Sequence, residues 1–521
     1  MRKYFTKKRI ITLYAVMLFL AASIFTYFHP LQFTGYELAY INPAPPVIPA
    51  LQQWQGGSGS FALSYTSRIV VNPAYNAQLL DTAGVFQNDL FNETGTKLPI
   101  VLANTPNTGD FFLTLTNLDS GLGNEGYLLD VEDAVTISAH TSTGVFYGTR
   151  TALQILREDS ARTYIPRGMA RDYPQYAERG FMLDVGRKYF PVSYLEDIVR
   201  VMAWYKMNDF QLHLNDNAPG AGNNPDWMRQ FAAFRLNSPN FPRLASSAGS
   251  YTEQDILALE SVARQYHVTI TPEIDMPAHD LALTQYRPDL ASPTYSKEML
   301  DLSNPATYTF VESLWNTFLP WFQTSQVDIG ADEYVASDAN SYRLFVNVLN
   351  TFLNQKGKTV RIWGSLTKMN SNIPVNTNIV IEDWNNSWSN PVDMVKQGFH
   401  IINVNDNLLY IVPKAGYYHD YLDTRQLYEQ WEPNIFDFTH PSLNLAPNDP
   451  HLLGGMFAVW NDALGKVSTT DVYARVKPAM PTLGEKLWSG PTIPLPYELF
   501  RQLAVLIGAP PGTHLPAVST W

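Results

Sequence analysis

The sequence predicts an α/β protein: a (β/α)8 barrel preceded by a small α+β domain and, at the N-terminus, a membrane-anchor or signal segment. From about residue 179 onward, short apolar runs of strand type recur eight times, and helical patterns such as YLEDIVRVMAWYK lie between them. Strands that alternate with helices form parallel sheets, and eight such units close a barrel. The eight runs are GFMLDV, DFQLHLND, VTITPEIDM, VDIGADE, TVRIWGS, IVIEDW, HIINVND and LGGMFAVWND.

The N-terminus has the pattern of a membrane-targeting segment. Residues 1–9 include five basic residues, and residues 10–28 form an uncharged, mostly apolar run of 19. That length just spans a bilayer, and no small-residue cleavage site follows it. We expect residues 1–30 to be an uncleaved anchor with its basic end inside; a cleaved signal peptide is the alternative. In both cases the bulk of the chain lies outside the cytoplasm, and only this segment contacts the membrane.

The next two segments lead into the barrel. Residues 31–60 are rich in Pro, Gly and Ser, which predicts a linker. Residues 61–170 contain short β-rich runs and then GVFYGTRTALQILRE, an amphipathic helical pattern, which together predict a supporting α+β domain. The barrel is then expected over residues 171–500, and residues 501–521 form a C-terminal tail.

Composition narrows the class of function. The chain has 521 residues, a net charge of −12 and no basic stripe, which argues against a nucleic-acid partner. It has no cysteine, so thiol nucleophiles, thiolate metal sites and disulfides are excluded. Hydrophobic residues make up 45% and charged residues 16% of the chain, as in globular proteins.

The stretch VDIGADEYVASD holds the strongest chemical signal. A buried strand pattern ends at a glycine, and Asp332 and Glu333 follow almost at once. Two adjacent carboxylates in a dry site have pKa values that are pushed apart, so that one stays protonated while the other stays charged. The alternative is a helix N-terminus, where acids are favoured by the dipole. Acids and tryptophans at the ends of the other strands favour the first interpretation, because the active site of a barrel lies there.

The remaining motifs point away from cofactor chemistry. Neither a dinucleotide loop nor a phosphate loop is present, and HExxH and GxSxG are absent. Asp275, His279 and Asp332 are candidate metal ligands, but their spacing matches no ligand signature, and His279 is better explained as a hydrogen-bonding pocket residue. We expect no metal and no cofactor. Carboxylates and indoles at a barrel mouth suit glycoside cleavage, in which an acid protonates the leaving oxygen and aromatic walls hold the sugar.

Six motifs in order along the chain resemble glycoside hydrolase family 20, the β-N-acetylhexosaminidases. They are RGFMLDVGRKYFP, HLNDN, TPEIDMPAH, DIGADEY, IEDW and GGMFAVWND. The resemblance extends to about residues 60–490, because GYLLDVEDAVTISAHTSTGVFYGTRTALQ is similar to the N-terminal domain of the family. The AFRLNSP and DEY details are nearer to bacterial exo-hexosaminidases and lacto-N-biosidases than to the lysosomal enzymes.

The resemblance implies substrate-assisted retention, in which the 2-acetamido group of the sugar is the nucleophile. Glu333 would be the general acid and later the base, and Asp332 would orient the acetamido group. Because neighbouring residues on a strand point in opposite directions, the strand end must bend for both to serve. The other implied sugar-binding or supporting residues are Arg187, Asp216, His279, Trp363, Trp384, Tyr410, Trp460 and Asp462.

More specific roles also follow from the resemblance. Tyr410 would donate to the acetamido oxygen, and the three tryptophans would wall the acetamido pocket. Arg187 would hold ring hydroxyls with Asp462, while Asp216 and His279 would support the acid from behind. Each of these residues also has a plain structural alternative, as a barrel salt bridge or as core.

Four positions depart from the family pattern. Asp328 and Ala331 replace the usual histidine and glycine of the acid motif, and Lys188 replaces the histidine after Arg187. Asp462 replaces a commoner glutamate and has a shorter reach.

We therefore expect an exo-acting enzyme that releases terminal β-linked N-acetylhexosamine, GlcNAc or GalNAc, from glycans. Two alternatives stay open: release of a disaccharide by the same chemistry, as in a lacto-N-biosidase, and a non-catalytic glycan-binding barrel.

Overall fold

The computed structural model describes residues 41–521. The predicted anchor and the first part of the predicted linker lie outside this range. Within the described residues, no helix combines the length and apolarity needed to cross a bilayer.

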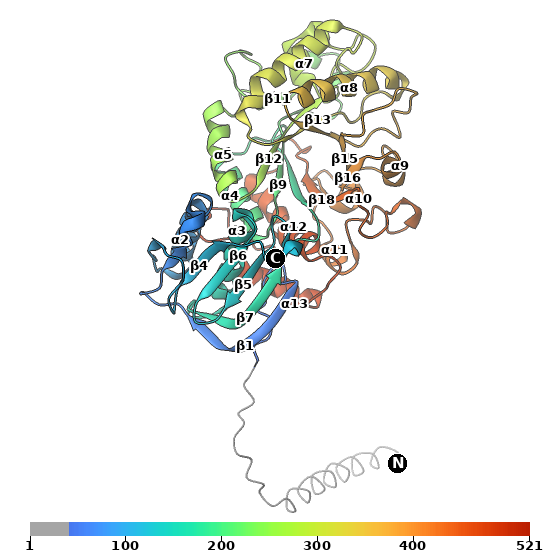
Figure 1. Ribbon diagram of the computed structural model, residues 1–521. Helices are drawn as coiled ribbons and strands as arrows, with labels where there is room; N and C mark the ends of the chain where they lie inside the picture. Colours follow the sequence, from blue (N-terminus) through green and yellow to red (C-terminus); the bar gives the residue numbers. More distant parts are fainter. Residues whose placement is uncertain (1–40) are drawn as a thin grey trace, which may run out of the picture. The chain divides into compact units, whose positions relative to one another are not determined.

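The N-terminal domain is a seven-stranded mixed sheet whose strands follow the order β1-β7-β5-β6-β4-β2-β3. Helix α2 (Asn76–Thr94) and helix α3 (Ser142–Glu158) pack against it, and thirteen consecutive residues of α3 are buried. This domain is the lower part of Figure 1. Its strands are β1 (Gln53–Ala62), β2 (Ile69–Val71), β3 (Ile100–Leu102), β4 (Phe111–Leu115), β5 (Tyr127–Val131), β6 (Val135–Ala139) and β7 (Tyr164–Asp172).

The second domain confirms the predicted barrel. Eight parallel strands each pair with the next one along the chain. The last two are β16 and β18, and β18 also pairs with the first strand, β8, which closes the sheet. Each strand coincides with one of the eight apolar runs of the sequence. They are β8 (Glu178–Asp184), β9 (Asp209–His213), β12 (Thr269–Met276), β13 (Gln326–Gly330), β14 (Thr359–Trp363), β15 (Val380–Asp383), β16 (His400–Asn403) and β18 (Leu452–Val459).

Helices surround the barrel, and their ends follow sequence signals (Figure 1). Thr252 caps the first turn of α5 and Ser468 that of α12, each through a capping box with the acid three residues later. The helices are α4 (Val192–Trp204), α5 (Glu253–Gln265), α6 (Leu281–Tyr286), α7 (Pro305–Phe318), α8 (Ala339–Gln355), α9 (Pro391–Lys396), α10 (Asp406–Leu409), α11 (Thr424–Gln430), α12 (Thr469–Ser489) and α13 (Tyr497–Ile507).

The linker and tail predictions were wrong at their edges. Residues 53–60, whose Gly and Ser content suggested a flexible linker, form most of β1, because pairing with β7 supplies the hydrogen bonds that the composition does not promise. The last residues are also part of the fold: α13 extends to Ile507, and the ring of Trp521 packs edge-on against Phe500 at 5.9 Å.

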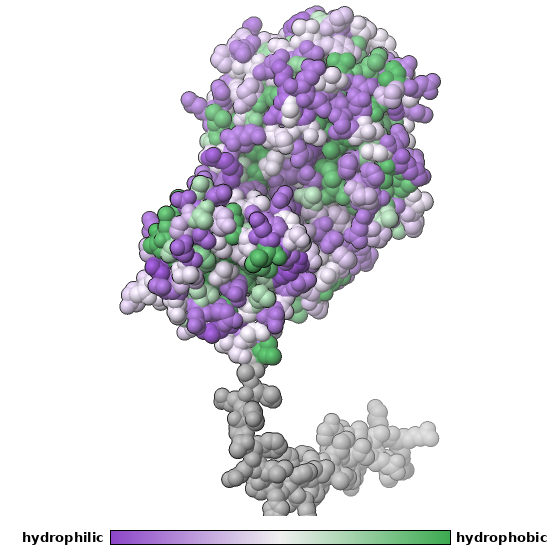
Figure 2. Space-filling view, viewed as in Figure 1, coloured by the Kyte–Doolittle hydropathy of each residue, from purple (hydrophilic) through white to green (hydrophobic). Residues whose placement is uncertain are grey.

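Buried polar contacts join the two domains. Lys206, at the end of α4, reaches Asp172 of β7 at 2.8 Å, and both side chains are almost fully buried. Arg179 of β8 binds Glu125, which precedes β5, at 2.8 Å. On the outside, the face shown in Figure 2 is mainly hydrophilic, with hydrophobic residues in scattered groups, as on ordinary protein surfaces.

Candidate active site

The acid pair sits where β13 ends, and the backbone there is bent. Gly330, Ala331 and Glu333 have φ values of 68°, 70° and 49°, in the left-handed region that residues other than glycine seldom adopt. The turn is held by the Asp328 carboxylate, which accepts the Gly330 N–H at 2.5 Å, and by the Ala331 N–H, which donates to the Met276 carbonyl at 3.1 Å. The bend brings Asp332 and Glu333 into one pocket, as two roles on one substrate require.

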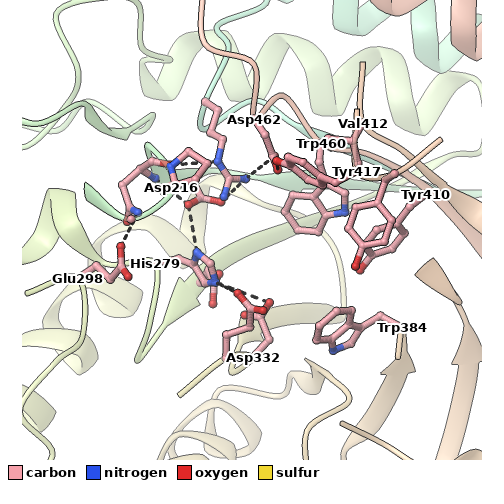
Figure 3. Close-up of a pocket in the computed structure, with 17 residues that line it drawn as sticks. Asp216, His279, Glu298, Asp332, Trp384, Tyr410, Val412, Tyr417, Trp460 and Asp462 are labelled. Carbon is pink, nitrogen blue, oxygen red and sulfur yellow. Dashed lines mark hydrogen bonds and ion pairs between the residues drawn. The ribbon is translucent and has the colours of Figure 1, made fainter. Parts of the chain in front are cut away.

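His279 connects the acid pair to the charged residues behind it (Figure 3). Its Nε2 lies 3.3 Å from Glu333 Oε2 and 3.9 Å from Asp332 Oδ2, while its Nδ1 lies 3.3 Å from Asp216 Oδ1. Asp216 Oδ2 in turn lies 2.6 Å from Arg187 Nη1. Asp216 and His279 thus lie in contact with the acid pair and with Arg187, and the supporting role that the resemblance implies for them stays a prediction.

Polar contacts continue from Asp216 down the inside of the barrel. His213 lies between two carboxylates, with Nε2 2.8 Å from Asp216 and Nδ1 2.6 Å from Glu273. Gln211 then donates to both Glu273 and Glu382, at 2.9 Å each. These residues are fully or almost fully buried, so the network fixes Asp216 from below.

The pKa values of Asp332 and Glu333 differ, but the raised pKa belongs to Asp332 and not to Glu333, the expected general acid. Burial, reinforced by the charges of Glu333 and Glu273, raises the pKa of Asp332 to about 6. The hydrogen bond from His279 lowers the pKa of Glu333 below its usual value. Burial alone would lower the pKa of His279, but Asp216 and Asp332 raise it well above its usual value. Below about pH 6, Asp332 is therefore the acid of the pair that holds a proton in the free protein.

Aromatic side chains form the opposite wall of the pocket. Trp384, Tyr410 and Trp460 line it, and the rings of Trp384 and Tyr410 are stacked at a centroid distance of 6.4 Å. The expectation that Trp363 also walls the pocket was wrong. Trp363 is fully buried beneath the other rings, and its indole N–H donates to Glu273 at 2.8 Å, so it supports the wall from behind.

Arg187 and Asp462 meet at the other end of the pocket. The Arg187 Nη1 lies 3.4 Å from Asp462 Oδ1, and it also lies 3.2 Å from Asp184. Burial by itself would lower the pKa of Arg187. The carboxylates of Asp184, Asp462 and Asp216 outweigh that effect and raise the pKa above its usual value, so the guanidinium stays charged. The sugar-binding role that the resemblance implies for Arg187 stays a prediction.

Several pocket residues were not predicted. Tyr417 donates to Asp462 at 2.5 Å, and Asn217 donates to Glu298 at 2.8 Å. Tyr417 and Glu298 lie in loops of no regular pattern, whereas Asn217 ends the short strand β10 (Asn215–Asn217) and the HLNDN motif of the sequence. The pocket has a volume of about 310 Å³, near the lower end for small-molecule sites. The additional lining residues are Asn217, Pro219, Gly220, Asp275, Glu298, Val412, Tyr417 and Tyr418.

Two protein-family models and several known proteins match this chain. The model of "Glycosyl hydrolase family 20, catalytic domain" matches residues 176–491, and that of "Glycosyl hydrolase family 20, domain 2" matches residues 44–173. A lacto-N-biosidase of Bifidobacterium bifidum is 25% identical over 475 residues, which cover 85% of this chain and 40% of that protein. β-Hexosaminidase subunit A2 of Dictyostelium discoideum is 27% identical over 409 residues, which cover 72% of this chain and 70% of that protein.

Solved structures show the same fold. A mutant β-hexosaminidase of Streptomyces plicatus in complex with its product GlcNAc superposes with a TM-score of 0.74 at 21% identity, covering 92% of this chain and 98% of that one. A β-N-acetylhexosaminidase of Streptomyces coelicolor gives 0.73 at 22% identity, covering 90% and 96%. The family match spans both domains and includes the acid pair and its pocket. The chain therefore belongs to glycosyl hydrolase family 20.

Proposed function

We propose that this protein is an exo-acting, retaining β-N-acetylhexosaminidase that uses the 2-acetamido group of its substrate as the nucleophile. The observation that carries the proposal is that Asp332 and Glu333 face one pocket whose opposite wall is Trp384, Tyr410 and Trp460. Because the two acids are neighbours in the chain, they approach a bound sugar from one side. That suits one acid for the leaving oxygen and one for a substituent of the same sugar.

Charge redistribution on binding prepares the pair for this chemistry. An acetamido N–H that donates to Asp332 stabilises its carboxylate, and a sugar that covers Glu333, whose side chain is 49% exposed in the free protein, removes water from it. Both effects move the single proton of the pair from Asp332 to Glu333. The His279 imidazole, in reach of both carboxylates, holds them in place during the transfer.

The reaction then proceeds in two steps. Glu333 donates its proton to the glycosidic oxygen while the acetamido oxygen attacks the anomeric carbon, and the aglycone leaves. Asp332 stabilises the positive charge of the resulting oxazolinium ion, and Tyr410 donates to the acetamido oxygen. Glu333, now a carboxylate, takes a proton from a water molecule. The oxygen of that water attacks the anomeric carbon, which opens the oxazolinium ring and gives a product with the same anomeric configuration as the substrate.

A panel of aryl glycosides on the purified protein tests this function. We expect hydrolysis of aryl β-GlcNAc or β-GalNAc, almost none of the 2-hydroxy analogues, and strong inhibition by a thiazoline mimic of the cyclised intermediate. Fast cleavage of aryl β-glucosides would contradict the proposal, because those substrates lack the acetamido nucleophile and need an enzymatic carboxylate instead.

Release of a disaccharide is the second candidate. The similarity to a lacto-N-biosidase over 85% of this chain supports it, as does Asp462, whose side chain is shorter than the glutamate usual in the family. Activity on an aryl lacto-N-bioside without activity on aryl β-GlcNAc would favour this candidate over the first.

The proposed place of action is outside the cytoplasm, on a membrane tether or after secretion. Support comes from the basic residues 1–9 and the apolar run 10–28, both outside the described range. Fractionation of cells that express the full chain tests this, with a form lacking residues 1–30 as the control. Recovery of the full chain in the cytosolic fraction would contradict it.

A further inference from the structure

A second chemistry is possible in the same pocket, because three of its residues form a set suited to a metal ion. Asp275 on β12, His279 just after that strand and Asp332 after β13 each offer one ligand atom, and these atoms lie within 4.8 Å of one another. The proposed reaction uses Asp332 and, as support, His279. It gives no role to Asp275.

Asp275 is a buried acid with an unused oxygen. The residue is 1% exposed, and its Oδ1 has no hydrogen-bond partner among residues 41–521; the same is true of Asp332 Oδ1. A side chain at position 330 would collide with this carboxylate, since a Cβ on Gly330 would lie 1.7 Å from Asp275 Oδ1. Burying a carboxylate oxygen without a partner is costly, and a cation is one way to satisfy it.

His279 is oriented as metal-binding histidines are. Its Nδ1 faces the Asp216 carboxylate, and its Nε2 faces Asp332 and Glu333 (Figure 3). A ligating imidazole usually binds the metal through one ring nitrogen while the other N–H donates to a carboxylate, which fixes the tautomer. Asp216 Oδ1 lies 3.3 Å from Nδ1 without forming a hydrogen bond, and a small rotation of the ring would make Asp216 that carboxylate.

We propose that the active-site pocket binds one Zn²⁺ ion through Asp275, His279 Nε2 and Asp332, and that the bound ion inhibits the enzyme. One imidazole and two carboxylates are a zinc ligand set, with a fourth position left for water or Glu333. Zinc bonds of about 2.0–2.2 Å place tetrahedral ligands about 3.4 Å apart, so ligand atoms that lie up to 4.8 Å apart have to approach by up to about 1.4 Å. The ion takes the place of the Nε2 proton of His279.

Inhibition follows from the ligands themselves. A metal-bound Asp332 cannot accept the acetamido N–H, and a metal-bound His279 no longer contacts Glu333. Zinc and substrate should therefore exclude one another. This inference goes beyond the proposed function, and zinc binding can be measured whether or not the substrate assignment is correct.

The direct test is a zinc titration of the full chain, freed of metal, in competition with a chromophoric chelator. We expect one Zn²⁺ per chain, with affinity reduced about tenfold or more in Asp275→Asn, because that substitution removes one charged ligand. The matched control is Asp280→Asn, which removes an equally buried acid next to His279 and outside the ligand set; we expect its zinc affinity to stay within about twofold. Equal affinity in Asp275→Asn and wild type would overturn the proposal.

A second measurement does not depend on how any variant folds. Saturating thiazoline mimic should abolish zinc binding to the wild-type chain, and ZnCl2 should raise the KM for aryl β-GlcNAc without changing kcat. MgCl2 should do neither, because Mg²⁺ prefers an octahedral shell of oxygen ligands and keeps its waters. Zinc bound at full stoichiometry beside the inhibitor would place the ion elsewhere and refute the assignment.

Discussion

The base and the mouth of the barrel both hold buried charged side chains, but the two regions differ in how the polar atoms of these side chains are satisfied. At the base, the Arg361 guanidinium reaches Asp209 at 2.6 Å, Glu178 at 3.1 Å and Glu382 at 3.4 Å, and its Nε donates to Gln326 at 2.7 Å. The guanidinium is fully buried, and each of its nitrogens has an acceptor. Three carboxylates share this one guanidinium, so removing it would leave them buried without a counter-charge.

At the mouth, several buried polar atoms have no partner within the described part of the chain. These include one oxygen each of Asp275 and Asp332 and the indole nitrogens of Trp384 and Trp460. The backbone is also left-handed at His279, Ala331 and Glu333. Unsatisfied atoms and left-handed backbone both cost stability, and at the mouth they occur in or beside residues that line the pocket, where a ligand can use them. The base is thus arranged for the fold and the mouth for a ligand.

The largest effect is expected at the mouth, from Glu333→Gln. Loss of the general acid should lower kcat about 10²–10⁴-fold with little change in thermal stability. The loss should be smaller on an aryl glycoside with a strongly acidic phenol, because that leaving group needs little protonation. Equal losses on good and poor leaving groups would show that Glu333 is not the acid.

The next effect concerns the base. Arg361→Met leaves several buried carboxylates without their counter-charge and should cost about 3–5 kcal/mol of stability, measured by thermal and denaturant unfolding. The control is Arg229→Met, whose side chain is 84% exposed and which should change stability by less than about 0.5 kcal/mol. Equal effects of the two variants would remove the contrast between base and mouth.

A pH dependence separates the two acids of the pair. In the productive form the acid pair carries one proton. This form exists at pH values above the lowered pKa of Glu333 and below the pKa of about 6 of Asp332. As pH rises above about 6 this proton is lost, so kcat/KM of the free enzyme should fall about tenfold per pH unit. Asp332→Asn should remove this limb from the profile of its residual activity. A flat profile from pH 5 to 8 would contradict the assignment.

Asp328 lies between the two regions and combines features of both. One of its oxygens accepts the Gly330 N–H, and the other has no partner among residues 41–521; burial, with Glu382 and Glu273, raises its pKa well above the usual value. A raised pKa means that the folded state holds the proton more tightly, so this acid costs stability as pH rises above its unfolded value. Asp328→Asn keeps the acceptor and removes that cost.

We expect Asp328→Asn to raise the stability by about 1 kcal/mol at pH 7 and by less at pH 5, measured as the shift in thermal midpoint. Asp328→Ala, which also loses the contact with Gly330, is the comparison and should be less stable than Asp328→Asn. A larger gain in stability at pH 5 than at pH 7 would contradict the raised pKa of Asp328.

The smallest effect is expected from Ala331→Gly. A left-handed φ of 70° is unfavourable for alanine and costs nothing extra for glycine, although glycine loses more entropy on folding. The net gain in stability should be below about 1 kcal/mol, with kcat within about twofold of wild type. A clear loss of stability would show that the methyl group of Ala331, which is fully buried, contributes more by packing than the strain costs.

Much of the fold followed from the sequence because each barrel strand is a short apolar run between helical patterns. The acid pair could be found for the same reason, since it directly follows such a run. Trp363 was misplaced because a tryptophan at a strand end can face the pocket or the core, and only neighbouring strands decide which. Tyr417 and Glu298 were missed because loops have no periodicity that predicts where their side chains go.

The barrel, the family resemblance and the adjacency of Asp332 and Glu333 could be predicted from the sequence, because they depend on local patterns along the chain. Which of the two acids has the higher pKa in the free protein could be found only from the folded structure. That outcome depends on His279, Asp216 and the buried Glu273, which come from other strands and lie close only in the folded barrel. Electrostatic interactions act through space and burial, and neither is visible in the order of residues.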